Sequence, residues 1–205
     1  MDERIAKTMA ALEKNRMKPY YAESCAQMRD IVRSLVKNDA LITAGGSMTL
    51  KDSGVTEMLM SEFGGAYIDR SAGETREQVE EIFRKAFTSD TFLTSTNALT
   101  EDGELYNVDG NGNRAAAMIY GPKQVIVVAG KNKIVRDMEQ AVCRVETVAA
   151  PKNAARLGCE TPCAKTGACA HCRSEARICC SYVRLGQQRV KDRIKVIIVD
   201  EELGY

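Results

Sequence analysis

The chain has 205 residues, 44% of them hydrophobic, which is enough for one sizeable core or for a main domain with a small appendage. Its 29 Lys and Arg residues nearly balance 28 Asp and Glu residues, so the net charge of +1 gives no electrostatic reason to expect a nucleic-acid partner. No apolar run reaches the roughly 18 residues that span a bilayer, and the charged N-terminus lacks the apolar core of a signal peptide. We therefore expect a cytoplasmic protein without membrane insertion.

The first part of the chain alternates helical and extended patterns. Apolar residues at helical spacing predict two helices within residues 1–38, one on each side of Pro19. The run "ALITAGG", residues 40–46, predicts a strand that ends in a glycine turn and leads into a helix. Residues 64–70 predict a second strand. Residues 74–88 predict a helix whose acidic start and basic end suit the helix dipole.

The middle of the chain predicts two further strands and a hairpin. Residues 91–96 are the third strand, and "ALT" and "ELYNV" beyond it can pair as a hairpin that reverses at Glu101-Asp102-Gly103. The continuous apolar run "QVIVVAG", residues 124–130, is typical of a strand that is covered on both faces. A long amphipathic helix follows and is expected to end at Pro151, before the cysteine-rich segment and two closing strands.

Strands that alternate with helices predict an α/β fold with a Rossmann-like, mostly parallel sheet flanked by helices. We divide the chain into N-terminal helices over 1–38, an α/β core over 39–150, and a cysteine-rich segment with closing strands of the same domain over 151–205. The glycine loop lacks both the P-loop lysine and the glycine spacing of a dinucleotide fingerprint, so no nucleotide cofactor is expected.

Two polar loops that follow predicted strands are candidate ligand sites. The loop "TAGGSMTL" offers backbone amides and hydroxyls that suit a phosphate or carboxylate, although it can equally be a strand-to-helix turn with a hydroxyl cap. The second loop follows the third strand, and an arginine beyond it can bind an anion with two hydrogen bonds; simple turn chemistry is the alternative. The residues expected to bind a small anionic ligand are Gly45, Gly46, Ser47, Thr49, Thr94, Ser95, Thr96, Asn97 and Arg114.

Six of the eight cysteines lie between residues 159 and 180. In a reducing cytosol, clustered cysteines are more often metal ligands or redox groups than disulfides. Four thiolates suit either an iron-sulfur cluster or zinc, and free thiols or one disulfide pair are the third alternative. His171, the only histidine, is expected to be a surface residue. The predicted metal ligands are Cys163, Cys169, Cys172 and Cys179, with Cys159 and Cys180 in reserve.

The blocks "TAGGSMTLKDSGV", "TSTNALTEDGELYNVDGNGNR", "TPCAKTGACAHC" and "IKVIIVDEELGY" resemble the lactate-utilisation (LUD) domain family, specifically its short single-domain members with a cysteine-bearing C-terminus. The resemblance implies a fold like that of the ribose-phosphate isomerase and CoA-transferase group. In that group the glycine loop and the loop after a central strand bound the ligand site. The matching positions here are Gly45, Gly46, Ser47 and Thr49 in the first loop and residues 94–97 in the second, with Glu101 and Asp102 as candidate catalytic groups.

The resemblance leaves three functions open. The first is a component or accessory of lactate or 2-hydroxy-acid oxidation, working with protein partners and carrying a cysteine-ligated iron-sulfur centre. The second is an isomerase- or transferase-type enzyme on a phosphorylated or CoA-linked small molecule, with zinc bracing the C-terminal loop. The third is a non-catalytic partner-binding protein.

Overall fold

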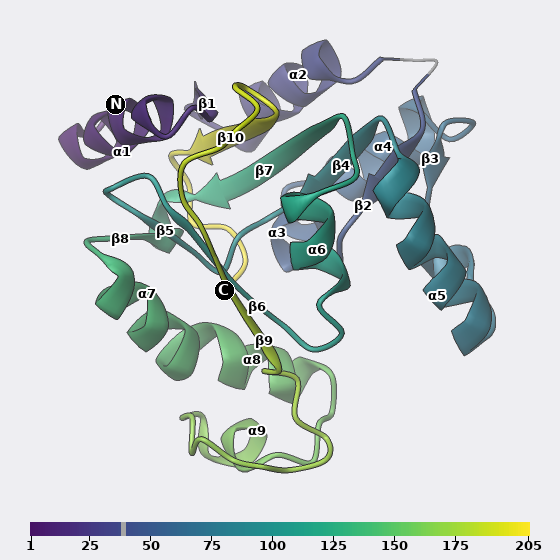
Figure 1. Cartoon of the computed structure of the whole chain (residues 1–205), viewed down its shortest axis with the longest axis vertical. Helices are drawn as coiled ribbons and strands as arrows, with labels where there is room; N and C mark the ends of the chain where they lie inside the picture. Colours follow the sequence, from purple (N-terminus) through teal and green to yellow (C-terminus); the bar gives the residue numbers. More distant parts are fainter. Residues whose placement is uncertain (38–39) are drawn as a thin grey trace.

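A six-stranded parallel sheet forms the centre of the molecule, in the order β1-β10-β7-β4-β2-β3 (Figure 1). This computed structural model describes residues 1–37 and 40–205. Every pairing within the sheet is parallel, which confirms the predicted Rossmann-like α/β architecture. Its strands are β1 (Lys18–Ala22), β2 (Ile42–Ala44), β3 (Tyr67–Ile68), β4 (Thr91–Thr94), β7 (Gln124–Gly130) and β10 (Ile194–Val199).

Helices cover both faces of this sheet because alternate residues of its central strands point in opposite directions. In β7, Val125 and Val127 belong to one buried cluster, whereas Ile126 and Val128 belong to another. The first cluster is completed by α1 (Glu3–Lys14) and α6 (Asn113–Ile119), and the second by α2 (Cys25–Leu35), α3 (Met48–Asp52) and α4 (Val55–Glu62). Burial on both faces explains the continuous apolar run of β7. Among the described helices, none has the length and apolar character needed to cross a bilayer.

A second, smaller sheet of four strands lies beside the first, in the order β8-β5-β6-β9. Its strands are β5 (Ala98–Thr100), β6 (Leu105–Asp109), β8 (Ile134–Val135) and β9 (Ser181–Leu185). β5 and β6 form the predicted hairpin, and the N–H of Gly103 donates to the carbonyl of Thr100 at 2.9 Å to close its turn. β9 was expected as a closing strand, but it pairs antiparallel with β6 and not with the central sheet.

The two predicted N-terminal helices are confirmed as α1 and α2, one on each side of Pro19. Between them lies a strand that was not predicted: β1 forms the edge of the central sheet, and Pro19 is compatible with that edge position. The prediction for the long helix is wrong at its end, because the helix does not stop at Pro151. It continues through α7 (Met138–Arg144), a π-helical turn η4 (Val145–Ala149) and α8 (Ala150–Arg156), and Pro151 lies in the first turn of α8, where proline is tolerated.

Replacing Gly103 by alanine tests how closely the β5–β6 turn packs on α1. Gly103 has φ +75°, and a Cβ there would lie 2.6 Å from both the carbonyl carbon of Ala11 and the nitrogen of Leu12. We expect the left-handed backbone and the clash to lower the free energy of unfolding by about 1–3 kcal/mol or more in urea denaturation. Gly158→Ala is the matched control, because its φ of +65° brings similar strain with no atom within 4 Å. Equal losses in the two variants would show that the turn does not press on α1.

Candidate functional site

A cavity of about 430 Å³ opens where the loops after β2, β4 and β7 meet at the carboxyl edge of the central sheet. This edge is where ligands of open α/β sheets bind, and the volume suits a small molecule. From the predicted ligand-binding set, the residues that line the cavity are Gly46, Ser47, Thr49, Ser95, Thr96, Asn97 and Arg114. The structure therefore brings both candidate loops to one cavity.

Gly45 and Thr94 lie just behind this lining. A Cβ on Gly45 would lie 3.1 Å from Cγ of Arg114, so the glycine gives the arginine room to pack against the end of β2. Thr94 is fully buried, and its hydroxyl donates to the carbonyl of Ser95 at 3.1 Å. Both residues support the shape of the cavity without facing it.

Glu101 and Asp102 lie away from the cavity, in the turn of the β5–β6 hairpin. Glu101 accepts a hydrogen bond from Nζ of Lys7 at 2.8 Å and another from Nε of Arg4 at 2.9 Å, both on α1. The hydrogen bond from Lys7 is the main cause that lowers the pKa of Glu101. The hairpin turns towards α1, so the structure does not bring either carboxylate to the predicted ligand site.

Lys133 is a lining residue that the sequence reasoning missed. It lies in the short helix η3 (Lys131–Lys133) directly after β7, and its side chain is buried with 4% of the residue exposed. Its Nζ donates to Thr49 Oγ1 at 2.8 Å, to Ser95 Oγ at 3.0 Å and to the carbonyl of Thr96 at 3.1 Å. None of these three acceptors carries a charge.

The surroundings of Lys133 disfavour its ammonium form. The pKa of Lys133 is lowered to about 7, and burial of the side chain is the largest cause. The positive charges of Arg144 and Arg114 lower it further, and the negative charge of Asp52 opposes them. A buried cation without a charged partner is unfavourable unless a ligand supplies the opposite charge. The sequence signal available for Lys133 is its place just beyond the carboxyl end of the apolar strand β7, the end at which ligands of α/β sheets bind.

Arg114 is bound by groups of the protein itself. Its Nε and Nη2 donate to Asp109 Oδ1 at 2.9 and 2.6 Å. Nη1 donates to the carbonyl of Ser95 at 2.8 Å and to Asn107 Oδ1 at 2.6 Å, and Nη2 also donates to Asn97 Oδ1 at 2.8 Å. All three nitrogens are thus engaged, so the predicted two-bond contact with an anion would have to break these bonds. In the structure Arg114 ties the loop after β4 to β6.

The lining is strongly cationic. Besides Arg114 and Lys133, three further basic residues line the cavity, namely Arg70, Arg156 and Arg177. The lining residues include a single carboxylate, that of Asp109. A Cβ on Gly46 would lie 2.0 Å from Arg70 Nη1, which means that only glycine lets this guanidinium rest on the loop after β2. An excess of positive charge in a cleft attracts anions.

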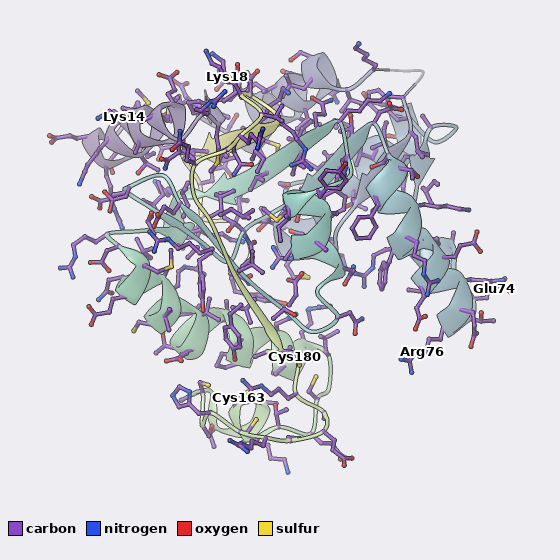
Figure 2. The ribbon with its side chains drawn as sticks, in the orientation of Figure 1. Lys14, Lys18, Glu74, Arg76, Cys163 and Cys180 are labelled. Atoms are coloured by element: carbon purple, nitrogen blue, oxygen red, sulfur yellow. The ribbon has the colours of Figure 1, made fainter. Side chains whose placement is uncertain are left out.

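The cysteine-rich segment forms one wall of the same cavity. After α8 the chain forms α9 (Pro162–Thr166) and then an irregular loop that leads to β9, at the lower end of Figure 1. Figure 2 labels Cys163 and Cys180 in this segment. Arg177, Ile178 and Cys180 line the cavity, and Arg177 donates to the carbonyl of Cys179 at 2.7 Å. The shape of this wall therefore depends on how the segment is held.

Among the predicted metal ligands, Cys163 and Cys169 lie close enough to Cys179 to affect its pKa, but the four thiols do not form a preassembled single-ion site. Cys163 is buried, and the other three thiols are half-buried. Burial, followed by the nearby thiols of Cys163 and Cys169, raises the pKa of Cys179 to about 11. A tetrahedral zinc site holds its sulfurs roughly 3.8 Å apart, since each lies about 2.3 Å from the ion. Across the described residues, the one group of three or more donors whose ligand atoms all lie within 4.8 Å of one another is Glu146, Cys169 and His171.

The thiols of the cysteine-rich segment are suitable donors for iron or zinc, although their present arrangement is not a tetrahedral cage. Of the two reserve residues, Cys159 is half-buried, whereas Cys180 is exposed and lines the cavity. His171 is exposed, as predicted.

Comparisons with known proteins show the fold and the family by separate findings. The structure of this chain is similar to the crystal structure of a DUF162 family protein from Deinococcus radiodurans, with a TM-score of 0.55 over 96% of each chain. The two sequences are 13% identical, so this likeness shows a shared fold. A search of curated proteins finds no match. The family model of the LUD domain matches residues 5–199, and the chain therefore belongs to the LUD (lactate-utilisation) domain family.

Proposed function

We propose that this protein is a component of lactate or 2-hydroxy-acid oxidation and that its cavity binds the small anionic acid. The observation that carries the proposal is the cationic cavity in which the buried Lys133 has only neutral acceptors. A ligand carboxylate would supply the missing negative charge. The hydroxyls of Thr49 and Ser95 beside Nζ suit the 2-hydroxyl group of the same ligand, because a hydroxyl can both donate and accept.

We also infer that the cysteine-rich segment holds a metal centre, either an iron-sulfur cluster or zinc. The closeness of its thiols supports this, as does the position of the segment at the wall of the cavity. An iron-sulfur cluster would accept electrons from the oxidation and pass them to a protein partner, whereas zinc would brace the wall. The ligands proposed from the spacing are Cys163, Cys169, Cys172 and Cys179.

A second candidate function is an isomerase- or transferase-type enzyme on a phosphorylated or CoA-linked molecule. The arginines of the lining favour this second function, because planar guanidinium groups suit phosphate oxygens; they are Arg70, Arg156 and Arg177. Lys133 favours it as well, since a group with a pKa of about 7 can move a proton efficiently at neutral pH.

Thermal unfolding with a panel of ligands separates these functions. We expect saturating lactate or pyruvate to raise the Tm by about 2–4 °C for each kcal/mol of stabilisation by the bound ligand, the ratio that applies to a chain of this size. Arg70→Ala should reduce the shift, because it removes a cation from the lining. Arg84→Ala should not, since this exposed arginine pairs with Glu80 on α5 (Arg76–Lys85), outside the cavity.

Two results would contradict the first function. A shift with 3-phosphoglycerate or CoA but none with lactate or pyruvate would favour the second candidate. No shift with any of these ligands would contradict both.

A further inference from the structure

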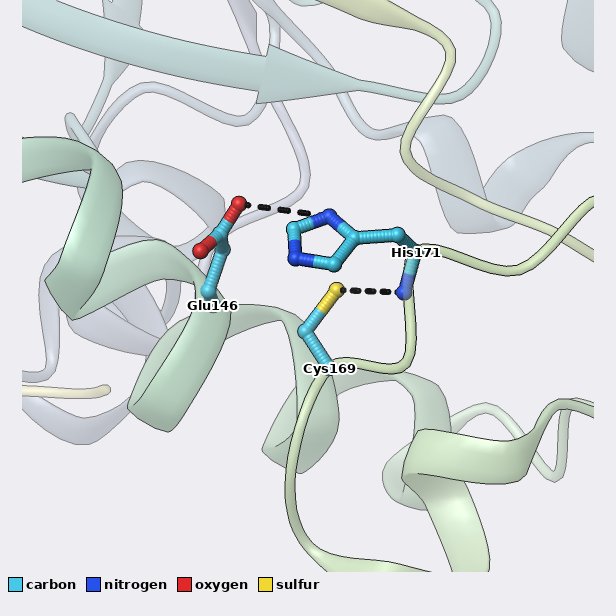
Figure 3. Close-up of side chains that lie close together, drawn as sticks. All are labelled: Glu146, Cys169 and His171. Atoms are coloured by element: carbon cyan, nitrogen blue, oxygen red, sulfur yellow. Dashed lines mark hydrogen bonds and ion pairs between the residues drawn. The ribbon is translucent and has the colours of Figure 1, made fainter.

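We propose that Glu146, Cys169 and His171 bind a single zinc-type divalent ion (Figure 3). The inference rests on the proposed metal centre of the cysteine-rich segment and names its ligands. It assigns Cys169 to a mixed site with one thiolate, one imidazole and one carboxylate, in place of a site with four thiolates.

The three donors come from two elements that the fold brings together. Glu146 belongs to the π-helical turn η4, and the other two residues belong to the loop after α9. One ligand atom from each residue lies within 4.8 Å of the others, and His171 Nδ1 lies 3.6 Å from Glu146 Oε1. Ligands about 2.0–2.3 Å from a tetrahedral ion are roughly 3.3–3.8 Å apart, so a modest movement of side chains would complete the contact.

The backbone already holds the loop in place for this contact. The N–H of Cys169 donates to the carbonyl of Glu146 at 3.1 Å, which joins the loop to the helix. The N–H of His171 donates to Sγ of Cys169 at 3.4 Å, which links the two loop residues. His171 has φ +47°, a left-handed conformation that is uncommon for a non-glycine residue. Its ring faces the carboxylate of Glu146, and the sulfur of Cys169 lies beside the ring (Figure 3).

The donor set favours zinc over an iron-sulfur cluster. Thiolate, imidazole and carboxylate are all ordinary zinc ligands, whereas clusters are held mainly by thiolates. A thiolate and a carboxylate together balance the two charges of the ion. The His171 side chain is 75% exposed, so an ion can enter from solvent and keep water as a fourth ligand. The ion would join η4 to the loop that leads to Arg177 and would thereby fix one wall of the cavity.

Cobalt(II) titration of the reduced full-length protein tests this site, because cobalt replaces zinc and gives a visible spectrum. The thiolate-to-cobalt absorption reports how many sulfurs bind, and we expect the intensity of one thiolate. His171→Ala and Glu146→Gln should each weaken cobalt binding about tenfold or more, since even loss of a partner behind a ligand typically costs that much. Glu175→Gln, the matched control, replaces an exposed carboxylate of the same loop that lies outside the donor group, and it should leave the affinity unchanged.

The mixed site and the four-thiolate centre predict different results in the same experiment. If Cys163→Ser, Cys172→Ser and Cys179→Ser abolish binding while His171→Ala does not, the mixed site is wrong and the four-thiolate centre stands. A brown chromophore after anaerobic purification, lost in the same three variants, would lead to that conclusion too. If the protein binds neither cobalt nor an iron-sulfur cluster, the proposed metal centre fails together with the mixed site.

Discussion

Replacing Asp109 by alanine is expected to lower the free energy of unfolding by about 3–5 kcal/mol, the loss typical of breaking a buried ion pair from one side. The side chains of Asp109 and Arg114 are only 6% and 12% exposed. Asp109 accepts two hydrogen bonds from Arg114 and a third from the N–H of Ala115 at 2.7 Å. Without the carboxylate, a buried guanidinium would remain unpaired in a cavity that already holds an excess of positive charge.

Urea denaturation followed by circular dichroism measures this loss, and two variants serve as controls. Asp109→Asn keeps an oxygen near the N–H of Ala115 but removes the charge, so we expect an intermediate loss. Glu80→Ala breaks exposed pairs with Arg76 and Arg84 on α5 and should change the stability by no more than about 1 kcal/mol. A loss in Asp109→Ala as small as that in Glu80→Ala would show that the pair does not support the cavity.

Replacing Lys133 by methionine is expected to abolish anion binding and to make the protein more stable. Methionine has a similar length, and it removes the cost of burying an ammonium that has only neutral acceptors. Residues of ligand sites often lower the stability of the unliganded protein, because the bound ligand compensates for the unfavourable burial. Lys131→Met is the control, because this neighbouring lysine is exposed and pairs with Asp200.

The effect of Lys133 on the free energy of unfolding should depend on pH in a definite direction. Lys133 has a pKa of about 7 in the folded protein, and an unfolded lysine has a pKa of about 10.4. Between these values the unfolded state binds more protons, so the contribution of Lys133 to stability rises with pH across this window and is lowest below pH 7. Lys133→Met should lack this rise in urea denaturation at pH 7 and pH 9. A variant that is less stable than the original protein at both pH values would contradict the account.

Local patterns predicted much of the fold. The continuous apolar run of β7 and the turn at Glu101-Asp102-Gly103 each depend on neighbouring residues, and both were confirmed. The small sheet was not predicted, because β9 pairs with β6 more than 70 positions earlier in the chain and no local pattern encodes that contact. β1 was missed for a related reason: its edge position, which accommodates Pro19, is set by the pairing with the distant β10.

The same difference between local patterns and distant contacts explains which residues of the candidate site could be predicted from the sequence. The two polar loops could be predicted because each follows its own strand, and the parallel sheet then places them together. Lys133 could not be distinguished from a surface lysine, because its burial depends on Thr49 in α3 and on Ser95 in the loop after β4. The turn that carries Glu101 faces α1 rather than the cavity, which is visible only once the hairpin has packed against that helix.

The central claim is that the ammonium of Lys133 forms an ion pair with the carboxylate of the ligand. Calorimetric titration with lactate at pH 6 and pH 8 tests this claim most directly. The charged groups around Lys133 are Arg114, Arg144 and Asp52, and neither an arginine nor an aspartate normally titrates between these pH values. We predict that lactate binds about tenfold more tightly at pH 6 than at pH 8, with proton uptake at pH 8, and that Lys133→Met shows no binding. Equal affinity at both pH values without proton uptake, or undiminished binding by Lys133→Met, would contradict the account.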